Sequence, residues 1–110
     1  MKPNKTWFKD HGWEKTVDEV QEEPEYSQTI KRHQVSYTYR SICGRHEIYA
    51  RWDHIVTSRY YKNELEKRSS YYMFYAYNNR TKFCVENKIS HRPLTEGQIK
   101  AAMLTVGVVM

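Results

Sequence analysis

The first apolar pattern in the chain has the spacing of a helix. Trp13, Val17 and Val20 stand at positions i, i+4 and i+7, and Pro24 follows them. That spacing would place the three side chains on one helical face, and proline cannot continue a helix. The pattern therefore predicts a helix over residues 13–23 with a narrow apolar face.

Two further segments carry helix signals. Tyr61 and Leu65 form an apolar pair four residues apart, with oppositely charged pairs at the same spacing, and predict a helix over about 58–68. Near the end of the chain, residues 95–98 read Thr-Glu-Gly-Gln, which has the form of a capping box. This motif predicts a third helix over about 96–104.

Between these helices the apolar period changes to two, which is typical of strands. Residues 33–42 and 46–54 alternate apolar and polar side chains on either side of a Gly-Arg turn. Residues 71–77 are rich in tyrosine, and a pair of asparagines separates them from a return strand over 82–88. Two β-hairpins are therefore expected.

The expected elements run in the order α-β-β-α-β-β-α. At 110 residues the chain has the length of one domain. The prediction is an α+β fold: a single small domain with about four antiparallel strands in two hairpins and helices packed on one face.

Charge divides the chain into two parts. Residues 1–25 hold seven acids and four lysines, a net charge of −3, whereas residues 26–110 hold fourteen bases and six acids, a net charge of +8. We therefore expect an acidic N-terminal helical arm, 1–25, on a basic sheet-containing body, 26–110. The acidic side chains of Glu14, Asp18 and Glu22 could contact a basic partner.

The sequence lacks the motifs of common enzymes. Its four glycines build neither a phosphate-binding loop nor a dinucleotide turn, and it contains no Gly-x-Ser-x-Gly elbow. A magnesium nuclease could be assembled from Asp53, Glu86 and Lys88, but ordinary ion pairing on a strand face explains these residues as well. We expect no enzymatic activity and no cofactor.

A zinc site is a second, weaker alternative. Cys43 and His46 are close enough in sequence to share one ion, and Cys84 and His91 could complete a tetrahedral set. Unreactive buried thiols are more common than such sites, so no metal is predicted.

The N-terminus is polar and charged, unlike a signal peptide, and the longest apolar stretch, residues 101–110, is too short to span a bilayer. These features predict an intracellular, cytoplasmic protein without a membrane contact and with reduced cysteines. The apolar C-terminus could pack against the domain, or it could join two copies in a homodimer.

Tyrosine and arginine give the strongest functional signal, with ten tyrosines in the chain. If helices cover one sheet face, strand alternation buries one set of side chains and leaves a second set open. The expected buried set is Val35, Tyr37, Tyr39, Ile48, Ala50, Trp52, Tyr72, Phe74, Ala76, Phe83 and Val85. The expected open set is Arg40, Tyr49, Arg51, Tyr71, Tyr75, Tyr77 and Lys82, with Lys31 and Arg32 extending its positive charge.

Aromatic rings stack on unpaired bases, and basic side chains neutralise phosphates. The same residue types anchor protein interfaces. The sequence therefore predicts a non-enzymatic binding protein that acts on nucleic acid or on a nucleic-acid-handling enzyme, such as a phage-type inhibitor of a host defence or nuclease complex. A module that binds single-stranded nucleic acid directly is the alternative.

Overall fold

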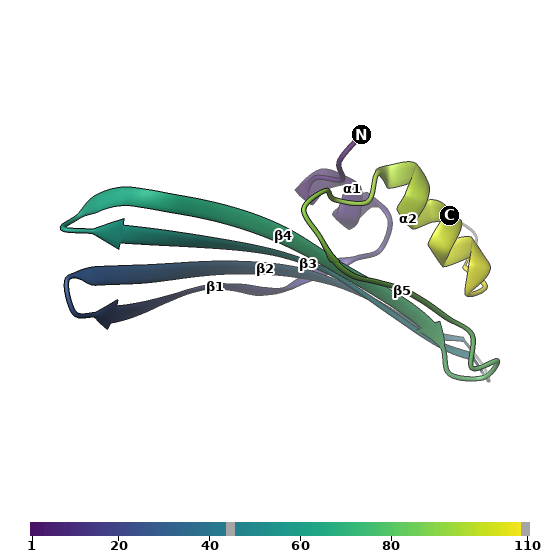
Figure 1. Ribbon diagram of the computed structural model, residues 1–110. Coiled ribbons are helices and arrows are strands. Elements are labelled where there is room, and N and C mark those ends of the chain that lie inside the picture. Colours follow the sequence, from purple (N-terminus) through teal and green to yellow (C-terminus); the bar gives the residue numbers. More distant parts are fainter. Residues whose placement is uncertain (44–45, 109–110) are drawn as a thin grey trace.

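One antiparallel sheet dominates the computed structural model, which describes residues 1–43 and 46–108. Its strands are β1 (Glu14–Glu25), β2 (Gln28–Cys43), β3 (His46–Tyr61), β4 (Glu64–Asn78) and β5 (Cys84–Ser90). They pair in sequence order, so the sheet is a simple meander (Figure 1). Helix α1 (Lys5–Asp10) precedes the sheet and helix α2 (Glu96–Thr105) follows it.

The predicted α+β class, with helices packed along one face of a four-stranded sheet, is wrong. The described chain is mostly a five-stranded sheet with strands of up to 16 residues, and its two helices have 6 and 10 residues. Both helices lie over one end of one sheet face, at the right of Figure 1. The order α-β-β-α-β-β-α fails because two of the three predicted helices are strand.

The first failure is the helix predicted over 13–23, which is strand β1. Each residue of β1 from Val17 onward pairs with β2, and a register shift lies between Lys15 and Val17. The apolar stripe does not form one face: Trp13 is buried just before the strand, whereas Val20 is 63% exposed. Pairing along a neighbouring strand outweighs the weak local helix preference.

The second failure is the helix predicted over 58–68, which is the hairpin of β3 and β4. Lys62 and Asn63 form its turn, and both have positive φ, 49° and 68°, as a two-residue hairpin turn of the I′ kind requires. Tyr61 and Leu65, the expected apolar pair, stand on opposite sides of this turn and are 44% and 50% exposed.

Other predictions are confirmed. The strand segments 33–42, 46–54 and 71–77 lie within β2, β3 and β4, and helix α2 begins at the predicted capping box of Thr95 and Gln98. The burial parity of β4 is also as predicted, since Tyr72, Phe74 and Ala76 are buried. Phe83 is a miss: it precedes β5 and is 55% exposed.

The hydrophobic core lies between the helices and the covered end of the sheet. Phe8 of α1 and Ile99 and Met103 of α2 are fully buried against residues of β2, β3 and β4. Val106, just after α2, joins the same core. Val106 and Val108 of the apolar C-terminal segment therefore pack on their own domain, whereas Leu104 is 62% exposed. The homodimer contact through this segment stays a prediction, and residues 109–110 lie outside the described residues.

Away from the helices, β1 to β4 continue as a single layer that we call the sheet arm, residues 19–33 and 56–70 (Figure 1, left). The two hairpin turns at its tip are joined by a hydrogen bond from the Lys62 amide to the Ser27 carbonyl, 3.2 Å. The molecule is therefore elongated, 54 × 25 × 23 Å.

Within the part of the chain that the structure describes, neither helix has the length and apolar character that crossing a membrane requires.

Candidate binding interface

Strand register brings five of the predicted open-set residues together on the sheet face opposite the helices. Arg40 of β2 pairs with Tyr49 of β3, which pairs with Tyr77 of β4. In the next open-face row, Arg51 of β3 pairs with Tyr75 of β4. Residues paired across strands share a face, so these side chains form one surface, which we call the tyrosine face.

The three tyrosine rings of this face contact one another. Ring centroids are 5.6 Å apart for Tyr49 and Tyr75 and 5.6 Å for Tyr49 and Tyr77, and the rings of Tyr75 and Tyr77 are nearly parallel at 6.3 Å. The guanidinium carbon of Arg40 lies 5.5 Å from the centroid of Tyr49, a cation–π distance. Tyr77 remains 37% exposed, so the cluster presents ring surface to solvent.

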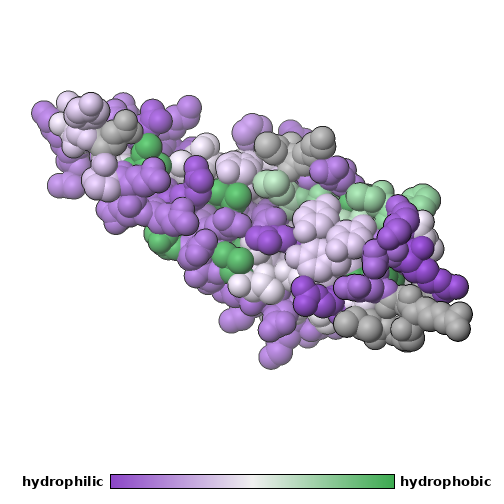
Figure 2. All heavy atoms as spheres, turned by 90° about the horizontal axis from the view of Figure 1, so that it is seen from below, coloured by the Kyte–Doolittle hydropathy of each residue, from purple (hydrophilic) through white to green (hydrophobic). Residues whose placement is uncertain are grey.

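Figure 2 views the molecule from below Figure 1, toward the side away from the helices. Pale, weakly polar residues gather on its right half, at the end where the helices lie on the far side, with strongly hydrophilic residues around them.

Burial raises the pKa of Tyr75 to about 12, and a hydrogen bond with Tyr49 adds to the rise. The phenol of Tyr75 therefore stays neutral at physiological pH.

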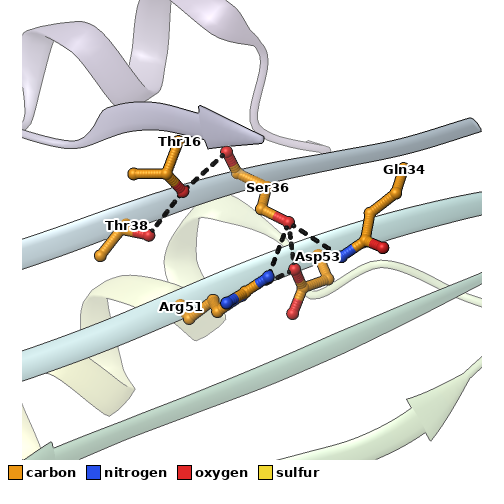
Figure 3. A network of polar contacts seen from close by, with 6 residues as sticks. All are labelled: Thr16, Gln34, Ser36, Thr38, Arg51 and Asp53. Atoms are coloured by element: carbon orange, nitrogen blue, oxygen red, sulfur yellow. Dashed lines mark hydrogen bonds and ion pairs between the residues drawn. The ribbon is translucent and has the colours of Figure 1, made fainter. Parts of the chain in front are cut away.

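A buried polar group supports this face from the neighbouring row (Figure 3). The hydroxyl of Ser36 donates to the carboxylate of Asp53, and Arg51 Nε donates to the same oxygen of Asp53 at 2.9 Å. Arg51 also donates to Ser36 Oγ at 3.3 Å. The hydrogen bond with Asp53 raises the pKa of Arg51. Asp53 thus fixes Arg51 beside Tyr75 and compensates its charge.

Thr16 of β1 joins this network: its hydroxyl donates to the Ser36 carbonyl at 3.5 Å and shares a hydrogen bond of 2.8 Å with the Thr38 hydroxyl (Figure 3). Within β2, Gln34 donates to Ser36 Oγ at 3.4 Å. This polar group is not predicted by the sequence pattern. Alternation puts Ser36 and Asp53 on the open face, but only the register of β2 against β3 shows that they meet.

The remaining basic and aromatic candidates are spread over the molecule. Tyr71 shares the open face but pairs with Ile55, farther toward the sheet arm. Lys82 lies in the turn before β5, where its ammonium donates to Asn79 at 3.0 Å. Lys31 and Arg32 point to opposite faces of the arm because they are adjacent in β2, and Lys31 lies 5.4 Å over the ring of Tyr60.

The acidic candidates lie on a strand and not on the predicted helix. Glu14, Asp18 and Glu22 belong to β1, an edge strand of the sheet. Asp18 is 2.7 Å from His33 and 2.7 Å from Lys15. Hydrogen bonds, first from His33 and then from Lys15, lower the pKa of Asp18 to about 2. The acidic helical arm is therefore an acidic sheet edge with one carboxylate already paired.

Of the four residues weighed as possible zinc ligands, the structure describes the side chains of two. The side chains of Cys43 and His46 lie outside the described part of the structure. Cys84 and His91 stand at opposite ends of β5, and a strand of that length separates them by roughly 20 Å. Among the described residues no three His, Cys, Asp or Glu side chains are grouped around a possible metal position.

Of the residues weighed for a magnesium site, Asp53 is buried, and its Oδ1 accepts hydrogen bonds from both Ser36 and Arg51. Glu86 pairs with Tyr75 on the open face and is exposed.

No protein-family model, curated protein or solved structure matches this chain. The geometry of the tyrosine face is therefore the basis for assigning a function.

Proposed function

We propose that this chain is a non-enzymatic binding protein whose tyrosine face takes single-stranded nucleic acid. The observation that carries the proposal is the contact of three tyrosine rings, 5.6–6.3 Å apart, on a sheet face that neither helix covers. Every nucleobase has a flat π surface, so such rings bind unpaired bases with little regard to sequence.

The strands prepare these rings for binding. Tyr49, Tyr75 and Tyr77 project from two paired strands, so little conformational freedom is lost when a base stacks on them. Arg40 stands at the margin of the cluster and is exposed, which allows its guanidinium to reach a phosphate. The net charge of +5 favours a polyanion over long range.

Fluorescence anisotropy with labelled single strands of roughly 16 nucleotides, with a duplex in parallel, tests the proposal. Tyr49→Ala or Tyr77→Ala should weaken binding by about five- to 150-fold, because one stacked base contributes about 1–3 kcal/mol. Tyr61→Ala is the matched control, since Tyr61 is 44% exposed at the tip of the sheet arm. Equal losses in the control, or no binding to any single strand, would overturn direct binding.

Arg40→Gln separates stacking from charge. It should reduce the slope of log affinity against log salt by about one while leaving base stacking in place. An unchanged slope would remove Arg40 from phosphate contact.

A nucleic-acid-handling protein is the second candidate partner, because the tyrosine face is not uniformly basic. Asp53 compensates Arg51, and Glu86 lies beside Tyr75 in the register. Tyrosine and arginine in a charge-balanced surface are typical anchors of protein interfaces. This variant of the proposal includes the phage-type inhibitor of a host defence or nuclease complex.

Affinity purification of the tagged chain from its native cell, with and without nuclease treatment, decides between the two partners. A protein that stays bound after nuclease treatment and is lost in Tyr77→Ala supports the second candidate. Nucleic acid alone, released by high salt, supports the first.

A further inference from the structure

A pocket of about 350 Å³ opens on the other side of the sheet, away from the tyrosine face. It lies between the N-terminal segment and the covered face of β2 and β3, with Val35, Tyr37, Trp52 and His54 as its floor and Phe8 of α1 as a wall. Its volume is within the range of small-molecule sites, about 300–1,000 Å³.

The pocket is lined by aromatic rings in fixed positions. Phe8 stacks on Tyr37 with centroids 4.1 Å apart, and the centroids of Phe8 and Trp52 are 5.1 Å apart. His54 stacks on Tyr72 at 4.3 Å. These mutual contacts hold the rings in fixed positions, so the pocket presents a rigid aromatic surface, which favours a flat ligand over a flexible one.

Two polar atoms of the floor have no partner within the described structure. Trp52 is 4% exposed, and its indole Nε1 is buried without a hydrogen bond. His54 Nε2 is buried and unpaired in the same way. Burial lowers the pKa of His54, with smaller contributions from Lys2 and His33, so the imidazole is neutral at physiological pH. Buried polar groups of this kind normally have a partner, which makes each of them an attachment point for a ligand atom.

The rim of the pocket is positively charged. Lys2 and Lys5 line it, and the described lining contains no Asp or Glu. The ammonium of Lys2 lies 5.3 Å from the centroid of the Tyr72 ring, next to His54. The N-terminal segment that carries Lys2 is also tied to the start of α2, where the Met1 carbonyl accepts a hydrogen bond from the Glu96 amide at 2.8 Å.

We propose that this pocket binds a small aromatic anion, that is, a flat ring carrying a carboxylate or a phosphate. The ring lies against the floor of Tyr37, Trp52 and His54, an acceptor atom of the ligand takes the Trp52 indole proton, and the anionic group lies between Lys2 and Lys5. The site is on the opposite face from the tyrosine face and is independent of nucleic-acid binding there.

Isothermal titration at low salt with indole-3-carboxylate and with adenosine 5′-monophosphate tests the proposal and separates carboxylate from phosphate ligands. Neutral indole and adenosine are the matched probes without the charge. We expect at least one anion to bind with a dissociation constant on the order of 0.1–1 mM, about tenfold or more tighter than its neutral partner.

Variants locate the binding. The double variant Lys2→Ala/Lys5→Ala should weaken the anion by about tenfold, whereas Lys100→Ala, an exposed lysine of α2 that does not line the pocket, should leave it unchanged. Both lysines of the double variant are exposed, so the fold is retained.

The indole N–H resonances give a readout that does not depend on affinity. Bound ligand should shift the resonance of Trp52 more than that of Trp13, whose buried Nε1 is also unpaired but lies outside the pocket lining. The proposal is overturned if neither anion binds at millimolar concentration, if the neutral probes bind equally well, or if the lysine double variant binds like the unaltered chain.

Discussion

Asp53 is the side chain on which the open face of the sheet most depends. It is 6% exposed and accepts hydrogen bonds from Ser36 and Arg51. Asp53→Ala would leave the Ser36 hydroxyl and the Arg51 guanidinium without their acceptor, so we expect a loss of about 2 kcal/mol in the free energy of unfolding. Urea unfolding measures it. Glu86→Ala, an exposed carboxylate on the same face, should change stability by less than about 0.5 kcal/mol, and equal effects would contradict the assignment.

Asp18 predicts a pH dependence with a definite sign. Its pKa falls from the ordinary value of 3.8 to about 2, through hydrogen bonds from His33 and then Lys15. A carboxyl whose folded-state pKa is depressed stabilises the fold fully above its unfolded pKa and loses that contribution as the pH drops through the folded pKa. The contribution should therefore disappear between about pH 4 and pH 2. A carboxyl titration by NMR measures it, and His33→Gln should move the Asp18 pKa upward.

Single residues also show how far sequence reasoning reaches. Alternation was enough to place Tyr49 and Arg51 on one face, because the side-chain period of a strand is two. It did not settle the face of Tyr75, because residues 71–77 carry aromatic side chains on both faces. Which side chains meet across strands depends on register, and alternation does not determine register. The contact of Ser36 with Asp53, seventeen residues apart in sequence, could not be predicted for this reason.

Among the elements, β1 shows why a periodic pattern can mislead. Its apolar residues are few, and the side chains between them are mostly acidic, which suits an exposed helix face as well as an exposed sheet edge. The strand forms because β2 offers a partner along its whole length. Acidic side chains and Pro24 on an edge strand also discourage pairing with a strand of another chain. The residues that resemble a helix face in sequence therefore protect the sheet edge from association.

Helix α2 was predicted correctly because its start is a local motif. Thr95 accepts from the Gln98 amide at 3.2 Å, and the Gln98 side chain accepts from the Thr95 amide at 2.8 Å. Thr95→Ala should lower stability by about 1 kcal/mol through loss of the cap. Gly97→Ala should raise it by about 0.5–1 kcal/mol, since a Cβ there meets only the Thr95 hydroxyl at 3.9 Å. Thermal unfolding of both variants checks the opposite signs: an unchanged or higher stability of Thr95→Ala would contradict the capping box, and a loss in Gly97→Ala would contradict the propensity gain.

At the scale of the whole molecule, the sequence underestimated the length of the strands and therefore the shape. Residues of the sheet arm alternate weakly, with exposed side chains on both faces, so no single apolar stripe marks them as strand. Amino-acid composition therefore gives little information about the secondary structure of such a single-layer segment. Neither of its faces is buried, and strand pairing in a fixed register and the hairpin turns hold the strands together. The covered end, by contrast, has the clear alternation of Tyr37, Trp52 and Phe74 that burial on one face imposes.

This division of the sheet predicts two levels of local stability. Amides at the covered end, in segments 35–40, 48–54 and 72–77, lie over the hydrophobic core, whereas those of the sheet arm have only strand pairing. Local opening takes less free energy where few apolar contacts are broken, so the arm should exchange its amide hydrogens at least about tenfold faster than the covered end. Hydrogen exchange read by mass spectrometry on peptides from 19–33 and 56–70 measures the difference.

Equal protection of the two ends would contradict this division and would mean either that a second copy of the chain covers the arm or that strand pairing alone protects it. Repeating the exchange over a range of protein concentrations separates the two. Protection of the arm that falls on dilution comes from a second copy of the chain, because only association depends on concentration. Protection that is independent of concentration would place the stability in the strand pairing itself. The long hairpins of β1–β2 and β3–β4 would then be a rigid extension of the core.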